Sequence, residues 1–148
     1  MQAVIFIGIQ ATGKSSFFKD MFFDSHIRIN LDMLRTRHRE RLLMNACIEA
    51  KQPFAIDNTN PSAKDRAGYI EAAKAAGFEI VGYYFQSNIG EAIARNSTRT
   101  GSDRVPPKGI AGTHKRLELP SLAEGFDILK YVMIKDGKFV VKDWLNEI

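Results

Sequence analysis

The chain alternates between short apolar runs and longer segments with helical spacing. Four apolar runs have the composition of buried β-strands, at residues 3–7, 27–30, 54–57 and 79–85. Five segments carry apolar residues at helical intervals and predict helices, at residues 14–22, 31–50, 61–76, 89–100 and 110–117. Strands that alternate with helices form right-handed crossovers. The pattern therefore predicts an α/β fold, a three-layer sandwich with a mainly parallel central sheet of four to five strands.

The C-terminal part of the chain follows a different pattern. Residues 131–134 and 139–141 are apolar runs on either side of residues 135–138, Lys-Asp-Gly-Lys. The Asp-Gly pair is typical of a tight hairpin turn. We expect a C-terminal β-hairpin there, attached to the parallel sheet as an antiparallel appendage.

Length and composition fit one folded domain. The chain has 148 residues, of which 26% are charged and 45% are apolar, and we expect residues 1–148 to form a single domain. No apolar run approaches the ~18 residues of a membrane span. The N-terminus has neither the basic region nor the cleavage site of a signal peptide, so a cytoplasmic location without a membrane partner is expected. The single cysteine, Cys47, cannot form an internal disulfide and is expected to be a buried apolar residue.

One motif carries most of the predicted chemistry. Residues 8–15 read Gly-Ile-Gln-Ala-Thr-Gly-Lys-Ser, the G-x-x-x-x-G-K-S pattern of a phosphate-binding loop, and they lie between a predicted strand and a predicted helix. The backbone N–H groups of such a loop and the helix N-terminus bind the phosphates of ATP or another nucleoside triphosphate. Lys14 is expected to reach the β- and γ-oxygens, and the Ser15 hydroxyl to ligate Mg²⁺. The predicted nucleotide-binding residues are Gly8, Gln10, Ala11, Thr12, Gly13, Lys14, Ser15 and Ser16. The fold is accordingly expected to be that of a P-loop NTPase.

Polar residues at the ends of two further strands are candidates for chemistry, because parallel sheets bind ligands at the carboxyl ends of their strands. Asp32 follows the second strand and could accept a proton from an attacking hydroxyl, with Arg35 one helical turn further on to hold an anionic part of the acceptor. Asp57 ends the third strand, where a carboxylate orders Mg²⁺ directly or through water. Taken alone, Asp32 could instead stabilise a helix N-terminus, and Asp57 could belong to an ordinary polar turn.

Positive charge is concentrated in two segments. Of the net charge of +4, residues 26–41 contribute +3, from five arginines against two acidic residues, and residues 88–118 contribute +3, from six basic against three acidic residues. In the second segment Arg95 and Arg99 are four positions apart, hence on one helical face. Phosphoryl transfer needs added positive charge, so we predict a helical lid that carries these arginines and is hinged at residues 101–107. A solvated helix face would show the same pattern.

Four segments in order resemble the 5′-hydroxyl polynucleotide kinase domain of bacteriophage and bacterial end-healing enzymes. They are the phosphate-binding loop, residues 29–35 (Ile-Asn-Leu-Asp-Met-Leu-Arg), residues 56–61 (Ile-Asp-Asn-Thr-Asn-Pro) and residues 95–99 (Arg-Asn-Ser-Thr-Arg). The resemblance covers about residues 1–107. It leaves the role of residues 108–148 unassigned.

The resemblance implies a role for each matched residue. Asp32 is similar to the general base for the 5′-hydroxyl, and Arg35 to the arginine that grips the phosphate on the 3′ side of the terminal nucleoside. Arg99 resembles the lid arginine that clamps the donor phosphates, with Arg95 nearby, and Asp57 resembles the acid near the metal. The implied substrates are ATP with Mg²⁺ and the 5′-hydroxyl end of RNA or DNA. Such domains are commonly fused to a phosphatase, a phosphodiesterase-like module or a ligase, for which this chain has no room, so the protein either acts alone or is an excised domain.

Three functions fit these residues. A polynucleotide 5′-hydroxyl kinase explains all of them, with a fused or separate phosphatase or ligase as its end-healing partner. A small-molecule kinase for a nucleoside, sugar or antibiotic hydroxyl would not need Arg35, and a non-catalytic nucleotide-dependent binding module would not need Asp32. The sequence does not indicate an oligomeric state.

Overall fold

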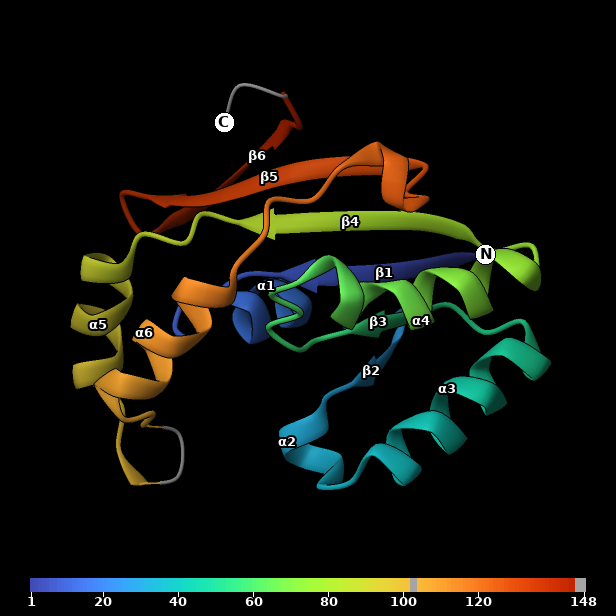
Figure 1. Cartoon of the computed structure of the whole chain (residues 1–148), viewed down its shortest axis with the longest axis horizontal. Helices are drawn as coiled ribbons and strands as arrows, with labels where there is room; N and C mark the ends of the chain where they lie inside the picture. Colours follow the sequence, from blue (N-terminus) through green and yellow to red (C-terminus); the bar gives the residue numbers. More distant parts are fainter. Residues whose placement is uncertain (102–103, 146–148) are drawn as a thin grey trace.

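In the computed structural model, which describes residues 1–101 and 104–145, six strands form one sheet in the order β2-β3-β1-β4-β5-β6 (Figure 1). The strands are β1 (Gln2–Ile7), β2 (Ile27–Ile29), β3 (Phe54–Ile56), β4 (Glu79–Phe85), β5 (Ile128–Lys135) and β6 (Lys138–Asp143). Strands β1 to β5 are parallel to their neighbours in the sheet, and β6 returns antiparallel to β5. The predicted α/β fold with a mainly parallel sheet is therefore confirmed, but the sheet has six strands instead of the predicted four to five, because both strands of the C-terminal hairpin join it.

Helices cover both faces of the sheet. They are α1 (Lys14–Met21), α2 (Leu31–Leu34), α3 (Arg37–Ala50), α4 (Ala63–Ala75), α5 (Ile89–Ser97) and α6 (Pro107–Arg116), with a short 3₁₀ helix η2 (Leu122–Glu124). Because strand side chains alternate between faces, Val4 and Phe6 pack against α1, whereas Ile5 and Ile7 pack against α3 and α4. No helix in residues 1–101 and 104–145 has the length and apolar character needed to span a membrane.

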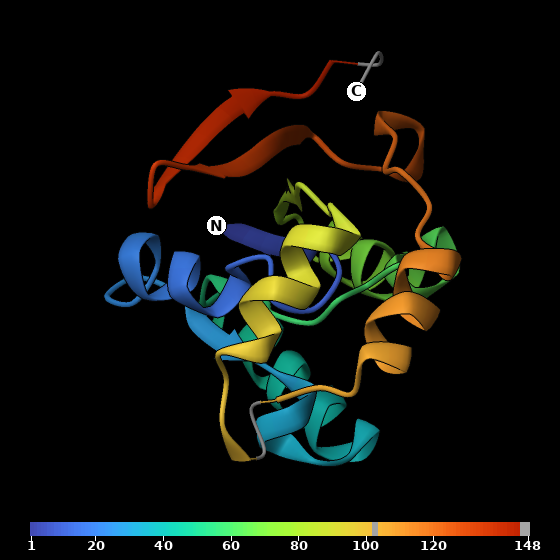
Figure 2. The same ribbon diagram turned by 90° about the vertical axis from the view of Figure 1, so that its left-hand side faces the viewer.

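Helices α5 and α6 lie beyond the carboxyl ends of the strands, where the β1–α1 loop also lies (Figure 1). Figure 2 views the molecule from this end, with both helices towards the viewer. A small apolar cluster of Ile9, Ala92 and Ile110 joins the loop to α5 and α6. Helix α5, which was predicted as the lid, and helix α6, which follows it, therefore both pack directly on the phosphate-binding loop; we call these two the lid helices.

The predicted C-terminal hairpin is present, and its first strand belongs to the central sheet. Strand β5 pairs in parallel with β4, with Tyr84 opposite Tyr131. The hairpin turn places both Asp136 and Gly137 at positive φ, as a two-residue hairpin loop requires. The ring centroids of Phe139 on β6 and Phe17 on α1 lie 5.2 Å apart. The hairpin thus extends the sheet and packs against the helix that follows the phosphate-binding loop.

The single helix predicted over residues 31–50 is two helices. Arg35 has a φ of 76°, outside the helical region, and ends α2. Thr36 then begins α3, because its hydroxyl accepts a hydrogen bond from the N–H of Arg39. Helix α4 also begins later than predicted, since Ser62 and Asp65 form a capping box at its N-terminus.

Candidate active site

The loop between β1 and α1 folds around the side chain of Lys14. This side chain is buried, and its Nζ donates hydrogen bonds to the carbonyl oxygens of Gly8 (3.0 Å) and Ile9 (2.7 Å). Two positions of the loop have positive φ, Ala11 at 61° and Gly13 at 94°. These turns direct the loop backbone towards the N-terminus of α1, which is the arrangement that binds phosphate.

Charged residues from three other loops act on Lys14. Burial lowers the pKa of the Lys14 ammonium from 10.5 to about 8. The carboxylates of Asp57 and Asp32 oppose this decrease, and the guanidinium of Arg99 adds to it. Asp57, Asp32 and Arg99 therefore lie close enough to Lys14 to change its protonation, although they follow β3, β2 and α5 respectively.

Ser15, Asp57 and Arg28 form a closed triangle of hydrogen bonds beside Lys14. The Ser15 hydroxyl donates to Asp57 Oδ2 (3.0 Å), and Arg28 donates both to Asp57 Oδ2 through Nε (2.8 Å) and to Ser15 Oγ through Nη2 (3.0 Å). Asp57 is only 2% exposed. A carboxylate this deeply buried needs a compensating charge, and Arg28 supplies one.

Hydrogen bonds to backbone carbonyl groups hold the loops after β1, β2 and β3 together. The Gly8 N–H donates to the Thr59 carbonyl (3.0 Å), and the Asn60 side chain donates to the Phe6 carbonyl (2.8 Å). On the other side, the Asn30 side chain donates to the Asp57 carbonyl (2.6 Å). The phosphate-binding loop, Asp57 and the segment leading to Asp32 are consequently parts of one connected structure.

Asp32 and Arg35 are exposed on α2, next to this structure. The side chain of Asn30 caps α2 by accepting from the Met33 N–H (2.9 Å). The Leu31 N–H donates to Asn58 Oδ1 (2.8 Å), which fixes the start of α2 against the loop after β3. Arg35 was predicted to lie one helical turn beyond Asp32, whereas its positive φ places it at the end of α2.

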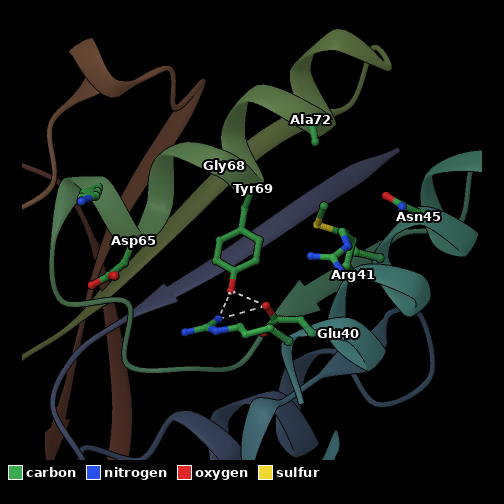
Figure 3. A pocket seen from close by; sticks show the side chains of 10 residues that line it. Glu40, Arg41, Asn45, Asp65, Gly68, Tyr69 and Ala72 are labelled. Carbon is green, nitrogen blue, oxygen red and sulfur yellow. Dashed lines mark hydrogen bonds and ion pairs between the residues drawn. The ribbon is translucent and has the colours of Figure 1, made fainter. Parts of the chain in front are cut away.

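A network of hydrogen bonds around the buried Glu40 carboxylate holds the side chain of Asn58 in place. Asn58 Nδ2 donates to Glu40 Oε2 (3.0 Å), while the Tyr69 hydroxyl (2.8 Å) and Arg37 (3.0 Å) both donate to Glu40 Oε1. Figure 3 shows Tyr69 and Glu40 in a groove of about 430 Å³ between α3 and α4. Burial, followed by the adjacent Glu40 carboxylate, raises the pKa of Tyr69 to about 12. Glu40 is therefore a buried anion that links the α3–α4 packing to the loop carrying Asp57 and Asn58.

The predicted lid arginines occupy different structural positions. Arg95 lies on α5 and donates to the carbonyl of Ala11 (3.3 Å), and it pairs with Glu91 at 3.5 Å. Arg99 was predicted to share a helical face with Arg95, but α5 ends at Ser97, so Arg99 lies beyond the helix. Of the predicted hinge, Ser102 and Asp103 lie outside the described residues.

Two further contacts join α6 to the phosphate-binding loop and α5 to the segment that precedes α6. Gln10 Nε2 donates to Thr113 Oγ1 on α6 (3.0 Å), which joins the phosphate-binding loop to the second lid helix. The Asn96 side chain bonds both the N–H and the carbonyl of Val105, which holds the segment before α6 against α5. These contacts hold α6 against the phosphate-binding loop and the segment before α6 against α5.

The oxygen atoms beside Lys14 suit a magnesium ion that arrives with a nucleotide. Within residues 1–101 and 104–145, no cluster of three or more His, Cys, Asp or Glu residues could hold a metal ion by itself. Mg²⁺ is commonly bound by one or two protein oxygens together with substrate phosphates. The Ser15 hydroxyl and the Asp57 carboxylate, which lie 3.0 Å apart, provide such a pair.

Sequence reasoning missed Arg28, Asn58, Glu40 and Phe139. Arg28 is identified by the register of β2 and β3, in which it lies opposite Ala55. Ala55 is two residues before Asp57 and therefore on the same face of the sheet. A Cβ atom at Gly13 would lie 2.8 Å from the ring of Phe139, so the hairpin also closes over the loop. Nothing in the local pattern around Glu40 or Phe139 indicated these contacts.

Comparison with known proteins agrees with this fold. The chain is 26% identical, over 97% of its length, to the bifunctional polynucleotide phosphatase/kinase of Schizosaccharomyces pombe, and it spans 36% of that protein. Its fold is similar to that of a sugar kinase from Janibacter sp. HTCC2649, with a TM-score of 0.68, 14% identity, and coverage of 88% of this chain and 85% of the kinase. It is also similar to Chaetomium thermophilum Kti12 in complex with ADP-AlF3, with a TM-score of 0.64, 14% identity and coverage of 90% of each chain.

The chain also matches a protein-family model. The model is described as an AAA domain, and it matches residues 4–120, which include the phosphate-binding loop, Asp32, Asp57 and both lid helices. This match covers well over half of the chain. The chain therefore belongs to the AAA domain family of P-loop proteins.

Proposed function

We propose that this protein is a kinase that transfers the γ-phosphate of ATP, or of another nucleoside triphosphate, to the 5′-hydroxyl end of RNA or DNA. The observation that carries the proposal is that hydrogen bonds join the phosphate-binding loop to the segment after β3, and that segment to the start of α2, which carries Asp32. A carboxylate near the lysine that binds the γ-phosphate can accept a proton from the hydroxyl that attacks this phosphate. The similarity to the fission-yeast protein, whose name includes polynucleotide kinase, supports a polynucleotide as the acceptor.

In the proposed reaction, Asp32 takes the proton of the 5′-hydroxyl as the oxygen attacks the γ-phosphorus. The bond between the γ-phosphorus and the bridging oxygen breaks, and ADP leaves. Lys14 and Arg99 would neutralise the charge that develops on the phosphate oxygens. Arg35, at the end of α2, would bind the phosphate that follows the terminal nucleoside.

Magnesium is part of the proposal. Ser15 would ligate the ion, and Asp57 would hold it directly or through water, as the oxygen pair beside Lys14 allows. When bound, the ion would neutralise negative charge on the β- and γ-phosphates. End healing would also need a 3′-phosphatase or a ligase, supplied by a fused or a separate protein.

The test is transfer of label from γ-labelled ATP to a short 5′-hydroxyl oligonucleotide, run beside nucleosides and sugars. We expect labelling of the oligonucleotide. Labelling of a nucleoside or sugar instead would identify a small-molecule kinase, and nucleotide binding without any transfer would identify a binding module.

Two variants sharpen the test. Asp32→Ala should abolish transfer and leave ATP binding nearly intact, because Asp32 is exposed and does not support the phosphate-binding loop. Equal loss of binding and transfer would refute its role as the base. Arg35→Ala should impair oligonucleotides much more than a 5′-hydroxyl nucleoside that lacks a 3′-phosphate.

A further inference from the structure

Arg28 occupies an unusual position for a cation. Its guanidinium binds the Ser15 hydroxyl and Asp57 Oδ2, which are the two protein groups that would hold a metal ion. Among the described residues, Lys14 is a second cation in the same site, since it lies next to Ser15 in the phosphate-binding loop. The carboxylate is therefore already compensated before any metal ion arrives.

A divalent ion and the guanidinium of Arg28 would compete for the same atoms. The Ser15 hydroxyl has one proton and two lone pairs; its proton goes to Asp57, and one lone pair accepts from Arg28 Nη2. An ion ligated by this oxygen would lie next to the guanidinium, because both would contact Ser15 and Asp57. Like charges at such a distance repel strongly inside a protein.

We propose that Arg28 is a resident cation that competes with the divalent metal for Ser15 and Asp57 and thereby weakens metal binding. The inference rests on the proposed metal site of the kinase. It assigns to Arg28 a function that goes beyond phosphoryl transfer, namely to set the concentration at which the metal ion binds.

The structure also indicates how the guanidinium of Arg28 can move away from Ser15 and Asp57 when a metal ion binds. Arg28 lies on β2, the strand at the edge of the sheet (Figure 1), and its side chain is 31% exposed. The guanidinium can therefore turn towards solvent without displacing a buried group. Nucleotide phosphates would bring enough negative charge to offset both cations, so the metal ion should enter with the nucleotide and bind poorly without it.

The experiment measures Mn²⁺ binding directly, by electron paramagnetic resonance, with protein saturated by a non-hydrolysable ATP analogue and with the analogue alone as the reference. Arg28→Gln removes the charge and keeps a polar side chain of similar reach. We expect it to bind Mn²⁺ about tenfold more tightly than the wild type, because one repelling charge has been removed beside the ion. Arg28→Lys keeps the charge and should bind Mn²⁺ with nearly the affinity of the wild type.

Two controls separate this inference from the proposed function. Lys19→Gln removes one positive charge from an exposed position of α1 and should leave Mn²⁺ affinity unchanged. Ser15→Ala should lose the Mn²⁺ binding that depends on the protein. If the wild type binds no more Mn²⁺ than the analogue alone does, the proposed metal site is wrong. If it binds Mn²⁺, and Arg28→Gln binds equally or more weakly, Arg28 does not compete and this inference fails.

A thermal measurement covers the possibility that Arg28→Gln folds poorly. Without metal, Arg28→Gln should melt below the wild type, since it leaves Asp57 buried without this partner. Adding Mn²⁺ and the analogue should raise the melting temperature of Arg28→Gln more than that of the wild type. An equal or smaller increase in the variant overturns the inference.

Discussion

The buried Glu40 allows a direct test of how the fold positions Asp32. Its Oε2 accepts from Asn58 Nδ2, and Asn58 in turn accepts from the Leu31 N–H at the start of α2. Glu40→Gln keeps the shape of the side chain but exchanges one acceptor oxygen for an NH₂ group. If the oxygen of the new amide faces Tyr69 and Arg37, its NH₂ group faces the NH₂ group of Asn58, and both are donors.

The size of the effect follows from these bonds. A hydrogen bond to a charged acceptor contributes about 1.5–3 kcal/mol, so we expect Glu40→Gln to lower the free energy of unfolding by about 2 kcal/mol. Asn58 must then lose its bond to position 40 or rotate and release the Leu31 N–H. Because a displacement of about 1 Å at a reacting group can cost roughly a hundredfold in rate, we expect kcat to fall at least about tenfold. The affinity for ATP should change little, since Lys14 and its loop do not contact Glu40.

Tyr69→Phe is the matched control. It removes one bond to the same carboxylate, on Oε1, and leaves the bond between Asn58 and Oε2 in place. We expect a similar loss of stability in urea denaturation with kcat close to that of the wild type. A decrease in kcat of the same size in both variants would show that general loosening of the α3–α4 groove, and not the position of Asn58, explains the effect.

Three further predictions follow from the phosphate-binding loop and its supports. Because the pKa of Lys14 is about 8 in the folded protein and 10.5 in the unfolded chain, the unfolded state binds the additional proton between these values. In the nucleotide-free protein, the free energy of unfolding should therefore increase by up to about 3 kcal/mol because of this group as the pH rises from 8 to 10.5. The Lys14→Met variant should lack this increase when both proteins are compared by urea denaturation at several pH values. Ala11→Gly should raise the free energy of unfolding by about 0.5–1 kcal/mol, because the alanine has a φ of 61°; a decrease in denaturant midpoint would contradict the inferred strain. Arg66→Met should lower the free energy of unfolding by about 3–5 kcal/mol, since Arg66 is fully buried, pairs with Glu124 and bonds three carbonyl groups; a midpoint within error of the wild type would refute this role.

Features of the site that depend on local sequence could be predicted. The phosphate-binding loop is fixed by a strand, two glycines and a helix start that adjoin one another in the chain. The neighbourhood of Lys14, Asp32 and Asp57 could also be predicted, because parallel strands bring their carboxyl ends to one edge of the sheet. The C-terminal hairpin followed from its Asp-Gly turn for the same local reason.

Helix ends were less predictable, because side chains there compete with the helical backbone. Thr36 caps α3 with its hydroxyl and so divides the segment predicted as one helix. At the end of α5, the hydroxyls of Ser97 and Thr98 donate back to the carbonyls of Ala94 and Arg95. Such bonds offer the backbone an alternative to a further helical turn, which leaves Arg99 beyond the helix.

The remaining site residues depend on how distant elements pack, which no local pattern encodes. Arg28 reaches Asp57 because β2 pairs with β3 in a register that sets Arg28 opposite Ala55, whereas a shift by one residue would turn Arg28 to the other face of the sheet. Glu40 reaches Asn58 because α3 lies beside the loop that follows β3, and Tyr69 of α4 and Arg37 supply the other partners of its carboxylate. Arg28 compensates the buried Asp57 carboxylate, and Glu40 holds Asn58 in place; neither residue contacts the reacting groups in the proposed reaction. A sequence motif identifies groups that contact the substrate, and the residues that hold those groups in place are found only when the register and the helix packing are known.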